Sequence, residues 1–132
     1  MIGNYLQRFI DDELVAWAGS GDRKPLLLRG ARQVGKTTVV RKLAGHFEHY
    51  IEVNFEEHRE IHTFFERNLS PDDIIENLSV YFKIPVIESK TLLFFDEIQA
   101  CIPALLSLRF FYEKKTNLHI IAAGSLLAFD LQ

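Results

Sequence analysis

The sequence predicts an α/β fold in which a mainly parallel sheet is covered by helices on both faces, as one three-layer α/β/α domain. Short apolar segments rich in strand formers alternate with segments whose apolar residues recur at helical spacing, and this order is typical of a parallel sheet. A glycine-bounded loop joins the first apolar segment to a helix, and two later apolar segments end in polar residues. Ligands bind at the carboxyl ends of the strands in such sheets, so we expect a site there.

The first half of the chain is expected to contain two helices and two strands. Apolar residues at helical spacing predict an amphipathic helix over residues 5–18, which turn residues 19–22 then end. The apolar run at 25–28 is typical of a buried parallel strand. A helix over 37–47 and a strand over 50–55, where strand formers alternate, follow from the same patterns.

The second half is expected to add helices and two more strands. Residues 58–67 favour a helix, and Ser70 followed by Pro71 and two acids is a strong start for another helix, which should run to about Phe82. We expect buried strands over 91–95 and 119–123, with mostly helical residues 98–115 between them.

The composition is that of a soluble globular protein, with 48% hydrophobic and 25% charged residues among 132, and 11 Phe to fill a core. The single cysteine allows no internal disulfide, and the N-terminal residues are too charged for a signal peptide or a membrane span. We therefore expect a cytoplasmic protein with no membrane partner. A net charge of −3 gives no support for nucleic acid as a partner, although it does not exclude one.

A phosphate-binding motif is the strongest functional signal. Residues 30–37 match G-x-x-x-x-G-K-S/T, between an apolar strand and an amphipathic helix. Backbone N–H groups of such a loop and the positive end of the helix bind phosphate, Lys36 would neutralise the β- and γ-phosphates, and Thr37 would offer its hydroxyl to Mg²⁺. A chance match in an ordinary strand–turn–helix is the alternative. The expected nucleotide-binding residues are Gly30, Ala31, Arg32, Gln33, Val34, Gly35, Lys36, Thr37 and Thr38.

Residues 92–97 (LLFFDE) indicate a buried strand that delivers carboxylates to the binding edge of the sheet. Asp96 is the candidate for holding Mg²⁺, and Glu97 for polarising the water that attacks the γ-phosphate. A helix N-cap is the structural alternative for this pair. Adjacent Asp and Glu favour hydrolysis over phosphate transfer to a small molecule.

Residues 119–125 form a third candidate element, an apolar strand that ends in Gly-Ser. Ser125 could face the γ-phosphate or the attacking water, or simply cap a helix beginning at Leu126.

Other polar residues have weaker cases for a functional role. His58 and His62 would share one helix face, but no carboxylate or cysteine pattern completes a metal site, which favours a solvated pair. Cys101 is expected to be a small buried hydrophobe. Arg109 is expected at the surface, with contact to a partner's nucleotide as the alternative.

The segments RGARQVGKTT, LLFFDEIQ and HIIAAGSLLAF resemble the N-terminal part of a family of prokaryotic AAA-type P-loop ATPases. The resemblance covers nearly the whole chain. It implies that residues 30–37 are the Walker A motif, that Asp96 and Glu97 are the Walker B pair, and that Ser125 is a sensor-1 residue. ATP and Mg²⁺ are the implied ligands, and Lys36, Glu97 and Ser125 the implied catalytic set.

The chain departs from that family by its length. Relatives continue to a fifth core strand, an arginine finger or second sensor, and a C-terminal domain of poorly understood function. In the related sheet order, the strand at 25–29 would be left at an edge, which native proteins usually cover. We therefore expect a fragment, completed by a C-terminal domain or a homo-oligomer. An ATPase is the first hypothesis, and a nucleotide-binding module without turnover of its own is the second.

Overall fold

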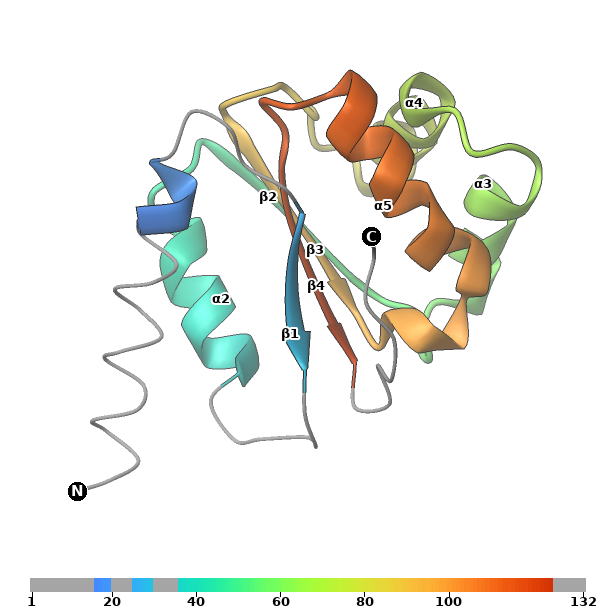
Figure 1. Ribbon diagram of the computed structural model, residues 1–132, viewed down its shortest axis with the longest axis horizontal. Helices are drawn as coiled ribbons and strands as arrows, with labels where there is room; N and C mark the ends of the chain where they lie inside the picture. Colours follow the sequence, from blue (N-terminus) through green and yellow to red (C-terminus); the bar gives the residue numbers. More distant parts are fainter. Residues whose placement is uncertain (1–15, 20–24, 30–35, 125–132) are drawn as a thin grey trace.

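A computed structural model describes residues 16–19, 25–29 and 36–124 of the chain. At its centre is a four-stranded parallel sheet with the strand order β1-β4-β3-β2 (Figure 1). The strands are β1 (Leu26–Arg29), β2 (His49–Asn54), β3 (Thr91–Asp96) and β4 (His119–Gly124). The parallel sheet confirms the expected fold class, and β1 lies at one edge of the described sheet, as expected.

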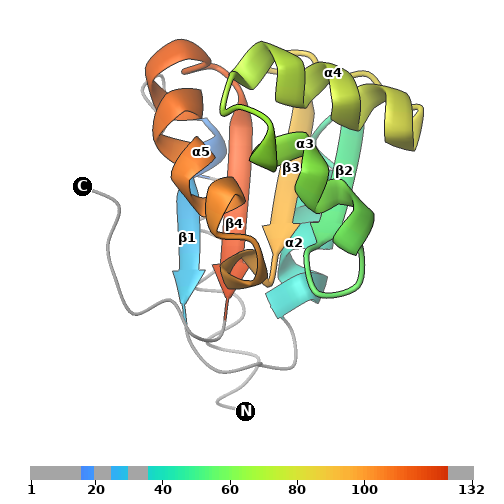
Figure 2. The same ribbon diagram turned by 90° about the vertical axis from the view of Figure 1, so that its right-hand side faces the viewer.

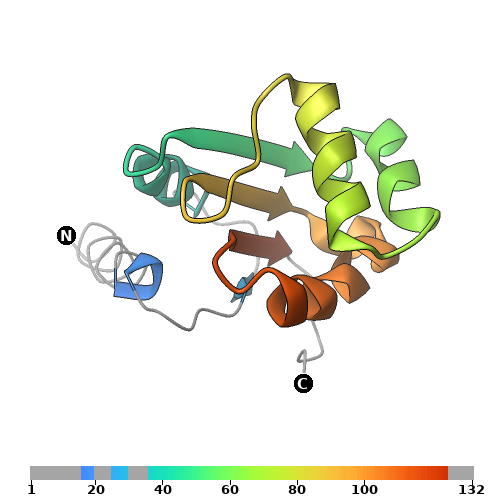
Figure 3. The ribbon, with the colours of Figure 1, turned by 90° about the horizontal axis from the view of Figure 1, so that it is seen from above.

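Helices cover both faces of the sheet, which gives the expected three layers (Figure 3). On one face lies α2 (Lys36–Ala44). The other face is covered by α3 (Thr63–Glu66), α4 (Pro71–Phe82) and α5 (Ile102–Lys114), which stand in front of the strands in Figure 2. The short 3-10 helices η1 (Arg59–His62) and η2 (Ile98–Ala100) precede α3 and α5.

Position in the sheet explains why the strands differ in sequence. Five of the six residues of β3 and all six of β4 are buried, since both strands have a neighbour on each side and helices on both faces. In β2, which has a described neighbour on one side only, buried and half-buried residues alternate from Ile51 to Asn54. Continuous apolar runs therefore mark the central strands, and alternation marks an outer one.

The larger core lies between the sheet and the layer of α3, α4 and α5. Three fully buried rings meet at its centre, from β3 (Phe95), the residue after β2 (Phe55) and α3 (Phe65). Their centroids are 5.4–5.7 Å apart, in edge-to-face arrangements, a geometry that stabilises aromatic pairs beyond their burial. The cluster joins β2, β3 and α3.

A smaller core and a polar network attach α2 to the other face. Val39, Val40 and Leu43 of α2 pack with the residues of β3 and β4 that face them. At the side of this core, Arg41 Nε and Nη2 donate to the two carboxylate oxygens of Glu52 at 2.9 and 2.7 Å, and Tyr50 Oη donates to Glu52 Oε1 at 2.6 Å. A fork-to-fork arginine–carboxylate pair fixes orientation as well as distance, so this network sets where α2 lies relative to β2.

Several expected boundaries were wrong by one or more residues. The second strand begins at His49 and ends at Asn54 instead of spanning 50–55, and helix α2 ends at Ala44 instead of residue 47. Residues 58–67 are not one helix, because a 3-10 turn precedes α3. Residues 98–115 are interrupted at Cys101, which has extended backbone. Of the expected helix at 5–18, residues 16–18 are described and are helical, and the rest lies outside the described residues.

Helix α4 was expected with nearly the bounds it has, but its N-terminus differs in detail. Ser70 is the N-cap and Pro71 follows, yet the Ser70 side chain makes no capping hydrogen bond; its backbone N–H donates to Asn68 Oδ1 at 2.8 Å. At the other end, Lys83 adopts the left-handed conformation with φ 56° and closes the helix through its N–H to Ser79 O. No helix in the described part of the chain is both long and apolar enough to cross a membrane.

Candidate nucleotide site at the carboxyl edge of the sheet

The strands and the helix that flank the predicted site residues meet at the carboxyl edge of the sheet. Arg29, at the end of β1, is paired with Gly124 at the end of β4, and Asp96 ends β3 beside Asn54 of β2. Helix α2 begins at Lys36 at this same edge (Figure 1). Strand β4 separates β1, which leads into the glycine-rich motif, from β3, which carries the carboxylates. Segments about 60 residues apart in the sequence therefore meet at one edge.

The expected phosphate loop is described only at its two flanks. Gly30, Ala31, Arg32, Gln33, Val34 and Gly35 lie outside the described residues. The flanks are a strand and a helix, as the motif requires: β1 ends at Arg29 and α2 starts at Lys36. On the first turn of α2, Thr37 is half-buried and Thr38 is exposed. The strand before the motif and the helix after it support the interpretation of the motif as a phosphate-binding loop.

Asp96 is held at the end of β3 by its backbone and by its side chain. Its carbonyl accepts from the Phe55 N–H at 3.0 Å, and its Oδ1 accepts from the Glu97 N–H at 2.9 Å. Alternation along β3 places Asp96 on the face of Leu92 and Phe94, which is the face that α2 covers. The carboxylate and the first turn of α2 thus share one face and one edge of the sheet.

Glu97 has an unusual backbone at the point where β3 ends. It adopts the left-handed conformation (φ 51°, ψ 45°), and the residue is only 5% exposed. Its carbonyl accepts from the Ala100 N–H at 3.1 Å and so starts η2. A non-glycine residue in this conformation costs about 1–2 kcal/mol, and such strain concentrates at functional sites. Glu97 occupies the N-cap position of η2, as the structural alternative expected, but its side chain makes no capping hydrogen bond.

Gln99 is a site residue whose role sequence reasoning missed. Its Nε2 donates to Glu97 Oε1 at 3.4 Å, while its Oε1 is buried and has no hydrogen-bond partner within the described part of the chain. A buried acceptor left unsatisfied costs about 1–3 kcal/mol. The motif DEIQ contains this residue, so the signal was present in the sequence, but only the turn at η2 places its amide against Glu97.

Asn54 is a second polar residue that the sequence analysis passed over. It lies beside Asp96 in the register of the sheet, and its Oδ1 accepts from the N–H groups of Glu56 and Glu57 at 2.9 and 3.2 Å. The side chain therefore turns the chain away from β2 at the candidate edge. The signal available in the sequence was its position as the last residue of a strand in which buried and half-buried residues alternate.

The charge of Asp96 acts on the hydrogen-bond network of Arg41, Tyr50 and Glu52 beside the site. Burial, together with the hydrogen bond and charge of Glu52, raises the pKa of the Tyr50 hydroxyl, and the negative charge of Asp96 adds to this shift. The Arg41 hydrogen bond lowers the pKa of Glu52 below its ordinary value, against the opposing effect of burial. Glu52 is therefore an anion at neutral pH, and Tyr50 remains a hydrogen-bond donor.

Ser125, the expected sensor, lies outside the described residues. The strand before it is as expected in type, except that β4 extends one residue further, to Gly124. Strand β4, whose last residue is Gly124, lies between β1 and β3, and the role of Ser125 stays a prediction.

Two of the weaker candidates, His58 and His62, differ from expectation, because they are half-buried instead of solvated. His62 Nε2 donates to Phe55 O at 2.7 Å, and His58 Nδ1 lies 3.2 Å from Asn54 O.

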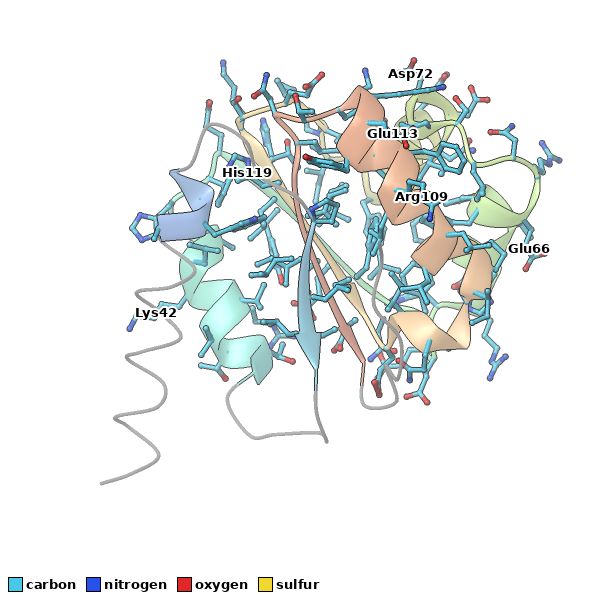
Figure 4. The ribbon with its side chains drawn as sticks, viewed as in Figure 1. Lys42, Glu66, Asp72, Arg109, Glu113 and His119 are labelled. Carbon is cyan, nitrogen blue, oxygen red and sulfur yellow. The ribbon has the colours of Figure 1, made fainter. Side chains whose placement is uncertain are left out.

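The other two weaker candidates lie where they were expected. Cys101 is buried, and burial raises the pKa of its thiol. Arg109 is exposed on α5, on the side of the sheet opposite to Lys42 and His119 (Figure 4).

Comparison with known proteins agrees with this architecture. The family model described as an AAA domain matches residues 22–131. No curated protein matches the chain. Among solved structures, the chain is similar to C. elegans PCH-2 with a TM-score of 0.57 and 16% identity, over 95% of this chain and 39% of that chain. At this identity the likeness shows the fold, and the chain spans about two-fifths of that structure. Because the family match extends over most of the sequence, the chain belongs to the AAA domain family.

Proposed function

We propose that this AAA domain binds ATP with Mg²⁺ at the carboxyl edge of its sheet and hydrolyses it there. The observation that carries the proposal is the convergence of Asp96 and Glu97, at the end of β3, with the first turn of α2 on one edge of the sheet. Membership of the AAA domain family supports the same interpretation.

The residues at this edge suit a magnesium–nucleotide complex. Mg²⁺ prefers oxygen ligands and is usually bound through one or two carboxylates plus substrate phosphates and water. Asp96 supplies a carboxylate and Thr37 a hydroxyl, while the described residues contain no group of three or more His, Cys, Asp or Glu that could hold a metal by themselves. In our proposal Thr37 and Asp96 hold Mg²⁺, which offsets negative charge on the phosphates.

The roles of the other residues follow the phosphoryl chemistry. Lys36 and the backbone of the loop would bind the phosphates. Glu97 would accept a proton from the water whose oxygen attacks the γ-phosphorus, as the bond from that phosphorus to the bridging oxygen breaks and ADP leaves. Ser125 would contact the γ-phosphate. The low exposure of Glu97 and its strained backbone support a chemical role over a solvated one.

Binding is tested with a fluorescent ATP analogue, with and without Mg²⁺, on the parent chain and on Lys36→Ala. We expect the substitution to weaken binding about 10- to 100-fold, since hydrogen bonds to charged groups contribute about 1.5–3 kcal/mol. Lys42→Ala, on an exposed turn of the same helix, is the matched control and should bind like the parent. A folded parent that binds no nucleotide would overturn the proposal.

Hydrolysis is tested by phosphate release from the parent, Glu97→Gln and the control Glu113→Gln, which lies on the exposed side of α5. Glu97→Gln should bind MgATP like the parent and lose turnover by about 10²–10⁴-fold. Turnover at the parent rate would refute the role of Glu97. Binding by the parent without turnover would assign the chain to the second function, a nucleotide-binding module.

The rest of the machinery is proposed from the family and from the composition. An arginine supplied by a second copy or by a C-terminal domain can raise such rates by about 10³-fold or more, so turnover per chain should rise with protein concentration if copies assemble. We propose a cytoplasmic location because a single cysteine cannot form an internal disulfide, which gives no sign of an oxidising compartment. Neither the charge nor the fold assigns a nucleic-acid target.

A further inference from the structure

We infer that Gln99 is a positioning residue for Glu97: its side-chain amide holds the Glu97 carboxylate in the orientation needed to accept a proton from water. The inference rests on the proposed function and goes beyond it, because it assigns a role to the last residue of the DEIQ segment.

The geometry begins with the turn that follows β3. Glu97 reverses the chain through its left-handed backbone, and η2 follows directly. Ile98, between the two polar residues, is completely buried in the larger core. With that residue anchored, the amide of Gln99 comes to 3.4 Å from Glu97, with Nε2 donating to Oε1. The distance is long for a neutral donor and leaves room for the bond to tighten when the site is occupied.

The fold itself does not require the amide of Gln99. Backbone hydrogen bonds close the turn, from Ala100 N to Glu97 O at 3.1 Å and from Cys101 N to Ile98 O at 3.0 Å. A glutamine that served only the fold would be expected to have both ends of its amide satisfied by the protein. Here Glu97 is the one hydrogen-bond partner of the Gln99 amide within the described part of the chain, and the buried Gln99 Oε1 accepts no hydrogen bond there.

Glu97 in turn needs a partner that fixes its side chain. A carboxylate that acts as a base must be held within hydrogen-bond reach of the proton it accepts. Removing a partner that orients a metal ligand commonly changes activity by about 10- to 100-fold, and we expect an effect of the same order for a group that orients a base. An amide N–H is suited to this task, since it donates to the ionised carboxylate without competing for the proton. Gln99 supplies that donor from two residues away.

A kinetic cycle separates positioning from a structural role. Gln99→Ala should lower the single-turnover rate of bound MgATP about 10-fold while leaving the dissociation constant within about two-fold of the parent. Gln99→Glu, which has nearly the same shape but lacks the N–H donors, should lose at least as much. Asn77→Ala, an exposed amide on α4, is the control and should change neither value. In a Glu97→Gln background, Gln99→Ala should cause no further loss, because the base it positions is absent.

Equal losses from Gln99→Ala in both backgrounds, or no loss in either, would overturn the inference. Nuclear magnetic resonance decides the matter even if the parent binds MgATP without turnover. The side-chain NH₂ signals of Gln99, identified by their disappearance in Gln99→Ala, should shift in Glu97→Ala and in Glu97→Gln, and not in the control Glu113→Gln. Unchanged signals in folded Glu97 variants would refute the hydrogen bond, whereas failure of the parent to bind nucleotide would refute the proposed function alone.

Discussion

Phe95→Ala tests how much the cluster of three buried rings stabilises the fold at β3, where Phe95 immediately precedes the candidate carboxylates. Phe95 is completely buried and makes edge-to-face contacts with Phe55 at 5.6 Å and Phe65 at 5.7 Å. Removing a buried phenylalanine side chain costs about 3–5 kcal/mol. For 132 residues, an unfolding entropy of about 2.1 cal/mol/K per residue corresponds to about 0.28 kcal/mol per degree. The thermal midpoint should therefore fall by about 11–18 °C.

Tyr81→Ala is the matched control, because Tyr81 also makes two edge-to-face contacts, with Phe64 at 5.8 Å and Phe82 at 4.9 Å, but is 42% exposed. Its loss should cost about 0.5–1.5 kcal/mol, or about 2–5 °C. Differential scanning fluorimetry and calorimetry measure both midpoints. If the thermal midpoint falls equally in the two variants, the loss of stability depends on ring contacts and not on burial. That result would refute the expectation that the buried Phe95 stabilises the fold more than Tyr81.

Three further predictions address other parts of the chain. Lys83→Gly removes about 1–2 kcal/mol of left-handed strain and costs about 0.5–1 kcal/mol of backbone entropy, so the net gain of up to about 1.5 kcal/mol should raise the thermal midpoint by up to about 5 °C. A lower midpoint would contradict this. The pKa of Glu52 lies below its ordinary value of 4.5 because of Arg41, so its stabilisation is present above that pH and is lost as the pH falls through the lower, folded pKa. Glu52→Gln should therefore lower the midpoint at pH 7, with a gap that closes in acid; a gap independent of pH would exclude the charged pair as its cause. Cys101 is buried, and burial raises the pKa of its thiol. It should therefore react slowly with a disulfide reagent at pH 8 in the folded chain and rapidly in urea. Rapid reaction of the folded chain would show that the start of α5 opens readily.

Much of the fold could be predicted from local patterns in the sequence. The apolar runs at β3 and β4 are long enough to indicate strands buried on both faces, and Pro71 with its two acids placed the start of α4. These signals are local because they depend on side-chain periodicity and on the chemistry of helix ends. Boundaries were less predictable where a 3-10 turn replaces the first turn of a helix, as at η1 and η2, because such turns have the same apolar spacing as a helix over three or four residues.

The candidate site divides in the same way. The phosphate-loop motif predicted Lys36 and Thr37 as site residues, and the apolar run that ends in Asp-Glu predicted Asp96, because phosphate and magnesium require those groups in that context; all three roles stay predictions. Tertiary structure alone decided that β4 lies between β1 and β3, that Asp96 faces the same side as α2, and that Gln99 approaches Glu97. These facts depend on strand order, register and one left-handed residue, which arise from packing between segments far apart in the chain, and no local periodicity encodes them.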